Sequence, residues 1–239
     1  MRGLVITDIK ITFQCGATLI TERHVLTAAH CITVPRTKVV VNPSNILISL
    51  GKYNLNVFDE QLQDRGVSNL FVHPQYNHSN LFNDIAVVEL STSVRVTNYV
   101  RPCCLWNGDS NLNAVVGKIG TVVGWGLSED KKFSHKLMQA KMPVVPTDEC
   151  FYSSQEYRWY LHQSNYCAGF RNGTAVCNGD SGGAMVFPRK GPNGQPVWYI
   201  RGIVSSSLKP SQELCDTSHY NIFTDVAKHS KWIKEIINK

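Results

Sequence analysis

Short runs of hydrophobic residues, several of them ended by a glycine, recur along this chain of 239 residues. Examples are residues 46–50, 115–116, 121–123 and 200–204, and a glycine directly follows each of the first three. Apolar runs of strand length between turn residues are typical of an all-β protein. The pattern therefore predicts many strands and few helices.

Hydrophobic residues with helical spacing are found near the C-terminus. Charged residues, mainly lysines, occupy the positions between them. The hydrophobic positions are Val226, Trp232, Ile233, Ile236 and Ile237. This spacing predicts one amphipathic helix over about residues 225–237.

Three short strings carry candidate chemistry: Thr-Ala-Ala-His-Cys ending at Cys31, Asp-Ile-Ala beginning at Asp84, and Gly-Asp-Ser-Gly-Gly around Ser181. A serine hydroxyl attacks a carbonyl poorly unless an imidazole takes its proton. The imidazole works best when a buried carboxylate orients it. His30, Asp84 and Ser181, in that order, are therefore candidates for covalent acyl transfer.

Each string alone also has an ordinary structural interpretation. A single histidine before a cysteine is usually a packed or surface residue, and Asp84 could lead a half-buried strand. The glycines around Ser181 could form only a tight loop. The occurrence of all three strings in one order favours the catalytic interpretation.

The string around Ser181 also satisfies Gly-x-Ser-x-Gly, the nucleophile turn of α/β-hydrolases. That fold needs a helix after the serine, and an acid and then a histidine further along the chain. The residues available for those roles are Asp216, Asp225, His219 and His229. However, residues 184–187 are apolar and precede Pro188, which predicts a strand ended by the proline. The hydrolase fold is disfavoured.

The chain resembles the trypsin/chymotrypsin family of serine proteases. The resemblance extends from residues 15–20 through the Gly-Trp-Gly string at 124–126 to the C-terminal helix. Within the family, residues 104–106, 169–185 and 219–225 look most like arthropod haemolymph proteases of the gastrulation-defective type.

The resemblance implies an all-β catalytic domain over residues 1–239, built of two packed six-stranded antiparallel barrels. The first barrel is expected at about 1–100 and the second at about 115–225, with the crossing between them near 99–115. The C-terminal helix is expected to pack on the second barrel. A chain with 43% hydrophobic and 18% charged residues is long enough for such a core.

The family also implies roles for further residues. The backbone N–H groups of Gly179 and Ser181 should form the oxyanion hole, and Ser205 matches the serine that hydrogen-bonds the buried aspartate. Ala175 stands where enzymes that cut after Arg or Lys carry a carboxylate. Ser207 and Asn221 replace glycines of the pocket wall. This substrate-binding set predicts a preference for small or medium uncharged side chains.

Asp180 matches the carboxylate that pairs with a new N-terminal ammonium after activation cleavage in this family. The first residues, before Cys15, do not contain the Ile/Val-Val-Gly-Gly segment that supplies that ammonium. We therefore expect the loop of Asp180 to be disordered, reoriented or otherwise paired, and the chain to be zymogen-like. The start also lacks a secretory signal. We interpret the chain as a fragment of a longer secreted protein that lacks its signal and upstream domains.

The eight cysteines are many for a reducing compartment and indicate an extracellular protein. By resemblance, Cys15 pairs with Cys31, Cys150 with Cys167, and Cys177 with Cys215. Cys104 matches the cysteine that tethers an upstream regulatory segment. Its neighbour Cys103 is left without an assigned role.

No cofactor or metal is expected, because Lys52 replaces an acidic ligand in the loop where relatives bind calcium. The net charge of +6 arises from scattered residues, so we expect no nucleic-acid partner. No hydrophobic run is long enough to span a bilayer, and no membrane partner is expected.

The leading hypothesis is a secreted serine endopeptidase in a zymogen cascade. Its expected partners are a protein substrate, such as a downstream zymogen, and a serpin-type inhibitor. The alternative is a non-catalytic protease homologue that acts as a binding or adaptor module. An intact His30, Asp84 and Ser181 argues against it.

Overall fold

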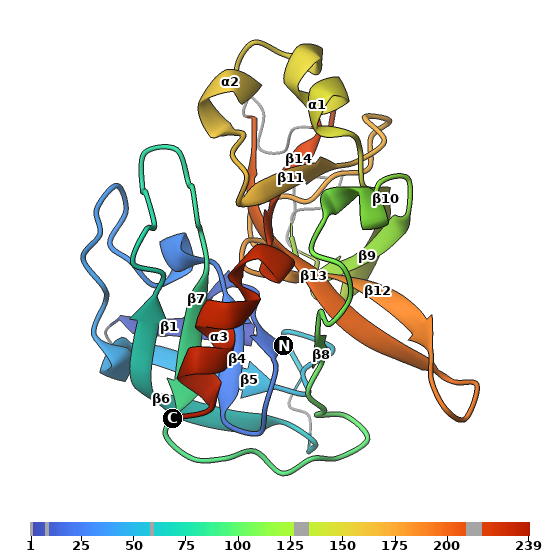
Figure 1. Ribbon diagram of the computed structural model, residues 1–239. Coiled ribbons are helices and arrows are strands. Elements are labelled where there is room, and N and C mark those ends of the chain that lie inside the picture. The colour runs from blue at the N-terminus through green and yellow to red at the C-terminus, as the bar shows by residue number, and fades with distance from the viewer. Residues whose placement is uncertain (1, 8–9, 58–59, 127–133, 209–216) are drawn as a thin grey trace.

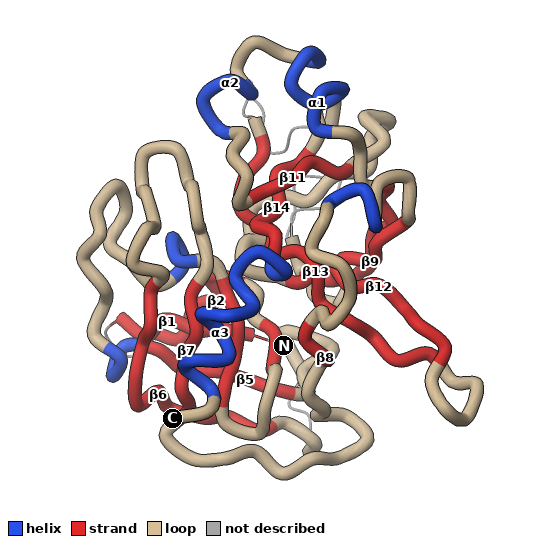
Figure 2. The backbone as a smooth tube through the Cα atoms, in the orientation of Figure 1, coloured by secondary structure: helices blue, strands red, loops and turns tan. Residues whose placement is uncertain are grey.

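The computed structural model describes residues 2–7, 10–57, 60–126, 134–208 and 217–239. Two curled β-sheets pack against each other, and few helices accompany them (Figures 1 and 2). Within the described residues, no helix combines the length and hydrophobicity that a bilayer-spanning segment requires. The predicted all-β class with two antiparallel sheets and a C-terminal helix is confirmed.

The first sheet contains seven strands in the order β2-β1-β5-β6-β7-β4-β3, all antiparallel. Their bounds are β1 Arg2–Thr7, β2 Lys10–Cys15, β3 Thr18–Leu19, β4 His24–Thr27, β5 Ile46–Leu50, β6 Gln63–Val72 and β7 Ala86–Leu90. The two ends of this order, β2 and β3, are one chain segment interrupted at Gly16 and Ala17. The interruption explains why seven strands are found where six were expected. Because both ends of the order belong to one chain segment, the sheet closes on itself.

The second sheet follows the order β10-β9-β12-β13-β14-β11, and β8 pairs with β13 in parallel. The bounds are β8 Cys104–Leu105, β9 Ile119–Gly124, β10 Met138–Pro143, β11 Asn165–Ala168, β12 Ala184–Lys190, β13 Pro196–Ser207 and β14 Asn221–Asp225. A single bridge between Val144 and Ala168 joins the two ends of the order. Six strands therefore form this curled sheet, and β8 lies beside it.

The helices are short. They are the 3₁₀ turns η1 Ala29–Cys31, η2 Pro43–Asn45, η3 Leu112–Ala114 and η4 Val226–His229, and the α-helices α1 Thr147–Ser153, α2 Tyr157–Tyr160 and α3 Ser230–Ile237. The expected C-terminal helix is thus divided, because Asp225 caps a 3₁₀ turn through Ala227 N–H before α3 begins. The pattern of hydrophobic residues did not predict α1 and α2.

Two expectations about strands were wrong. Val115 and Val116 lie outside the strands, because Val115 ends η3 and Val116 makes only one bridge, to Val144. Strand β12 also does not end at Pro188 but continues to Lys190, paired with β13. Its pairing with β9 covers only Met185 and Val186. Beyond them one edge of β12 is open, where a residue without an N–H is tolerated.

The C-terminal helix does not pack on the second sheet alone. Ile233 and Ile236 of α3 are buried in one cluster with Leu26 of the first sheet and Ile203 of the second. Figure 1 shows α3, in red, lying over β4 and β7. The helix therefore joins the two sheets at the boundary where the candidate site lies.

Candidate active site

His30 and Asp84 meet at the boundary of the two sheets. His30 lies in η1, directly after β4, and Asp84 lies just before β7. The Nδ1 atom of His30 is 2.7 Å from Oδ2 of Asp84, and the backbone N–H of His30 donates to Oδ1 at 2.9 Å. Two bonds to one carboxylate hold both the ring and its backbone, with the Nε2 edge of the ring left for other contacts.

The carboxylate of Asp84 is fully buried, with no exposed surface. Ser205 of β13 donates its hydroxyl to Oδ2 at 2.6 Å, and Thr224 of β14 donates to the backbone carbonyl of Asp84 at 2.9 Å. Both donors come from the second sheet. The position of Asp84 therefore depends on how the two sheets pack.

The same contact changes the basicity of His30. Burial lowers the pKa of His30, but the negative charge of Asp84 and its hydrogen bond to the ring outweigh that effect. The pKa of His30 is therefore raised above its usual 6.5. An imidazole positioned by a buried carboxylate in this way is suited to accept and return a proton.

Ser181 lies between β11 and β12, in the same cavity as His30. The cavity has a volume of about 340 Å³, and its walls also include Ser205, Ser206 and Ser207. Within the described part of the chain, the Ser181 hydroxyl makes no hydrogen bond to His30. Catalytic hydrogen bonds are often long without substrate and tighten in the complex.

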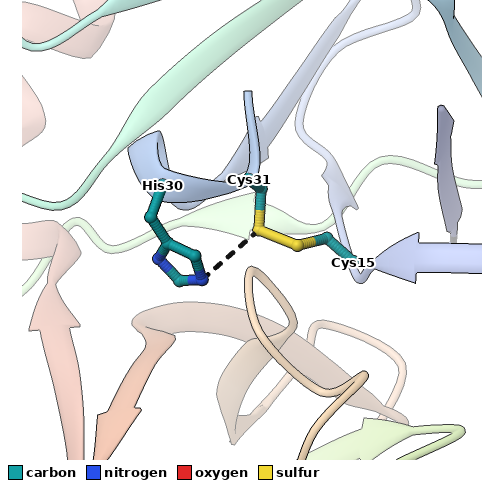
Figure 3. A group of neighbouring side chains, drawn as sticks. All are labelled: Cys15, His30 and Cys31. Carbon is teal, nitrogen blue, oxygen red and sulfur yellow. Dashed lines mark hydrogen bonds between the residues drawn. A yellow bond between two sulfur atoms is a disulfide. The ribbon is translucent and has the colours of Figure 1, made fainter. Parts of the chain in front are cut away.

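The Nε2 atom of His30 instead faces the disulfide between Cys15 and Cys31, 3.7 Å from Sγ of Cys31 (Figure 3). The ligand atoms of these three residues lie within 4.8 Å of one another. A metal binds cysteine as a thiolate. In the disulfide neither sulfur is a thiolate, so His30 alone could offer a ligand.

The backbone around Gly179 leaves two N–H groups unused. Gly179 has a φ of 97°, a conformation that favours glycine, and the N–H of Asp180 donates to the carbonyl of Cys177 at 2.9 Å. The N–H groups of Gly179 and Ser181 have no acceptor among the described residues. Unengaged donors beside a nucleophile are what an oxyanion hole requires.

The loop that carries Ser181 is tied to the first sheet at Gly16. The N–H of Gly16 donates to the carbonyl of Ser181 at 2.7 Å. A Cβ on Gly16 would lie 2.9 Å from backbone atoms of Gly183, too close for any side chain. This approach positions Ser181 against the segment that carries His30, because Cys15 is bonded to Cys31.

Comparison with known proteins gives the family. Residues 4–233 match the family described as Trypsin. Clotting factor C of Tachypleus tridentatus is 34% identical over 94% of this chain and 22% of that protein. Serine protease gd of Drosophila melanogaster is 30% identical over 95% of this chain and 48% of that protein. Chymotrypsin-C of Mus musculus is 35% identical over 93% of this chain and 78% of that protein. The chain belongs to the trypsin family.

The family assignment confirms the resemblance, including its arthropod character, since Serine protease gd is among the relatives. The chain spans 22% of clotting factor C and 48% of Serine protease gd, so it corresponds to only part of those relatives. The similarity to these relatives identifies the family of the domain as a whole. The roles of single residues are inferred from the geometry of the site.

In this trypsin-family chain, the described partners of Asp180 are backbone N–H groups and not an ammonium. Its Oδ1 accepts the N–H of Gly126 and its Oδ2 accepts that of Cys177, both at 2.9 Å. Burial raises the pKa of Asp180, and these two bonds lower it only in part. Of the three outcomes expected for this loop (disordered, reoriented or otherwise paired), these two bonds correspond to the last.

The predicted specificity residues lie together. Asn221 of β14 pairs with Ser207 of β13, and its Oδ1 accepts the N–H of Val176, the residue after Ala175. Ser207 lines the cavity, whereas Asn221 is completely buried. The Nδ2 of Asn221 has no hydrogen-bond partner within the described ranges.

The cysteines divide into bonded and free groups. Disulfides join Cys15 to Cys31 and Cys150 to Cys167, with Cα atoms 6.1 and 6.3 Å apart. Cys177 is disulfide-bonded, and its expected partner, Cys215, lies outside the described residues. The two free cysteines of the described chain are Cys103, half-buried, and Cys104, exposed.

Sequence reasoning missed several residues that build the site. Thr224 lies within residues 219–225, part of the family resemblance, yet a threonine in a strand carries no sign that it binds the carbonyl of Asp84. Asn83 precedes Asp84 with a φ of 52° and donates its backbone N–H to Ser164 Oγ at 3.1 Å. An asparagine before the Asp-Ile-Ala string was the available signal, because asparagine tolerates positive φ.

Proposed function

We propose that this chain is the catalytic domain of a secreted serine endopeptidase that acts through Ser181, His30 and Asp84. The observation that carries the proposal is the 2.7 Å contact of a fully buried Asp84 with His30, which lines the same cavity as Ser181. A binding module needs no buried carboxylate behind a cavity histidine.

The residues support a two-step acyl transfer. Ser181 Oγ attacks the peptide carbonyl while His30 Nε2 takes the hydroxyl proton, and the carbonyl π electrons move to the oxygen. His30 then returns the proton to the leaving amine as the C–N bond breaks. Water, activated by the same imidazole, releases the acyl group from Ser181. Asp84, bonded to Nδ1, orients and stabilises the imidazolium.

The oxyanion forms at the N–H groups of Gly179 and Ser181, which have no acceptor among the described residues. Loss of one such donor costs about 3–4 kcal/mol of transition-state stabilisation. For the proton transfer, Nε2 of His30, which lies 3.7 Å from Sγ of Cys31, has to accept a hydrogen bond from the Ser181 hydroxyl. Such bonds often form or tighten only in the substrate complex.

The biological setting is also part of the proposal. Relatives named clotting factor C and Phenoloxidase-activating factor 3 support a place in a proteolytic cascade. We infer a protein substrate, such as a downstream zymogen, and control by a serpin-type inhibitor. The disulfides support secretion, and exposed Cys104 supports a tether to an upstream regulatory segment.

Covalent labelling tests the proposal directly. The activated full-length protein should react with one equivalent of a fluorophosphonate, and Ser181→Ala should abolish the reaction. Ser206→Ala is the matched control, because Ser206 lines the same cavity and should leave labelling intact. Stoichiometric labelling of Ser181→Ala would show that another residue is the nucleophile. A folded, activated protein that stays unlabelled would favour the non-catalytic binding module.

A further inference from the structure

Arg36 occupies a backbone position that does not suit it. Pro35 and Arg36 are the central residues of a tight turn closed by Thr37 N–H donating to the carbonyl of Val34 at 3.0 Å. Arg36 has a φ of 60°. With proline second in the turn, the third residue at positive φ is normally glycine or asparagine. A side chain with a Cβ is kept there against a steric penalty, which is a reason to look for a function.

The turn places Arg36 in the wall of the proposed active-site cavity, together with His30, Ser181 and Pro35. A bond from Thr33 Oγ1 to the carbonyl of Ala29, 3.1 Å long, ties the base of the turn to the residue before His30. Arg36 therefore belongs to the His30 side of the cavity. The expected pocket for the residue before the scissile bond, with Val176 and Ser207, forms another part of the wall.

No negative charge in the described wall of this cavity balances Arg36. Its guanidinium makes no hydrogen bond or ion pair with the residues described, and none of the described residues lining the cavity is Asp or Glu. Asp84 does not line the cavity. It is buried, and its carboxylate oxygens are bonded to His30 and Ser205. A guanidinium presents parallel N–H groups that match a carboxylate.

We propose that Arg36 is a specificity-determining residue. It selects substrates that carry an Asp or Glu next to the scissile bond, at the position whose side chain meets the His30 side of the cavity. The inference rests on the proposed protease function and adds a substrate class to it. The selected side chain is distinct from the small or medium residue expected before the bond.

Two peptides that differ only in Glu or Gln at the flanking position test this preference. The activated enzyme should show a kcat/KM about fivefold higher for the Glu peptide at low salt, the size expected of an exposed ion pair. Added salt should reduce that ratio, since exposed charges are screened. Arg36→Gly should bring the ratio close to one. Its Tm should be no lower than that of the wild type, because glycine suits the positive φ.

Lys38→Ala is the matched control, because Lys38 is an exposed cation two residues away that is not among the residues lining the cavity. It should keep the wild-type ratio. The inference is overturned if the wild-type ratio is near one, if Arg36→Gly keeps it, or if Lys38→Ala abolishes it equally.

The failure of catalysis can be separated from the failure of this inference. If the activated protein cleaves neither peptide, the proposed function fails. The dissociation constants of the same two peptides for the Ser181→Ala protein then decide the role of Arg36. A Glu preference that disappears in the Ser181→Ala, Arg36→Gly double variant supports it, and equal constants overturn it.

Discussion

The Oδ1 of Asp180 accepts the backbone N–H of Gly126 at 2.9 Å. Gly126 belongs to the Gly-Trp-Gly string, and Asp180 precedes the candidate nucleophile, so the contact joins two motifs 54 residues apart. The second oxygen is held by Cys177 N–H. Among the described residues no cation pairs with this carboxylate, and burial raises its pKa.

An N-terminal ammonium should therefore increase activity. A chain carrying a freed Ile-Val-Gly-Gly N-terminus should hydrolyse a peptide substrate at least about tenfold faster than residues 1–239 alone. A buried carboxylate without a counter-charge is unfavourable, and the new ammonium would supply that charge to Asp180. The turnover of both forms is compared on one substrate. Acetylation of the new N-terminus is the control and should remove the gain. Equal turnover of the two forms would contradict the prediction.

The pH dependence follows from His30. Its pKa is raised by Asp84 despite burial, so kcat/KM should rise with pH through a value above 6.5. Asp84→Asn should move this limb to lower pH and reduce kcat by about 10⁴-fold, because the ring loses its charge partner and its correct tautomer. Profiles of kcat/KM against pH for both proteins check this. An unshifted limb in a folded Asp84→Asn protein would argue against His30 as the base.

The same contact has a consequence for stability. A histidine whose pKa is higher in the folded than in the unfolded protein contributes stability below its unfolded pKa. That contribution is lost as the pH rises through the raised folded pKa. The free energy of unfolding, measured against pH, should show this decline in the wild type and not in His30→Ala. A contribution that instead grew over this range would show that the pKa of His30 is lowered.

The activated enzyme should not cleave like trypsin. A basic side chain loses its hydration on entering a pocket, and Ala175 offers no charge in return. A peptide library should show small or medium uncharged residues before the scissile bond. Ala175→Asp should raise the relative kcat/KM for Arg and Lys by at least about tenfold. Thr174→Asp, at an exposed neighbouring position, should not. Dominance of Arg or Lys in the wild-type profile would refute this reading of the pocket.

The two free cysteines should differ in reactivity. Burial, with the neighbouring Cys104, raises the pKa of Cys103 to about 12, and its thiol lies 3.3 Å from the carbonyl of Trp198. The thiolate is the nucleophile in alkylation. In residues 1–239 alone, where Cys104 is free, iodoacetamide at mildly alkaline pH should therefore alkylate exposed Cys104 about a hundredfold or more faster than Cys103. Mass spectrometry of timed digests measures both rates. Similar rates would show that Cys103 is exposed in solution.

The native protein offers a second test of Cys104. Peptide mapping without reduction should find Cys104 in a disulfide with a segment upstream of Met1. Cys103 serves as the internal control and should remain a thiol. A free Cys104 in that material would rule out the tether.

Local patterns were enough for much of the fold. The strand at Ile46–Leu50 and the C-terminal helical face could be predicted because their periodicity depends only on which side of an element meets the core. The strings at His30, Asp84 and Ser181 could be recognised because their chemistry needs particular residue types.

Other features depend on neighbours that the sequence does not identify. Pro188 continues a strand because one edge of β12 is open there. The C-terminal helix packs on both sheets because its buried face meets residues such as Leu26 and Ile203. Such outcomes are set by which elements come together, and hydrophobic periodicity does not contain that information.

The sequence alone therefore determined the residue types of the candidate site and, through its short strings, the resemblance to the family, which implied the two-sheet class. Only the tertiary structure decided how the site is held. Thr224 reaches Asp84 across 140 residues, and Asp180 takes backbone N–H partners, one of the three alternatives that the sequence left open. Arg36 faces the cavity because of a turn with positive φ. These are contacts between distant segments, and their geometry exists only once the two sheets have packed.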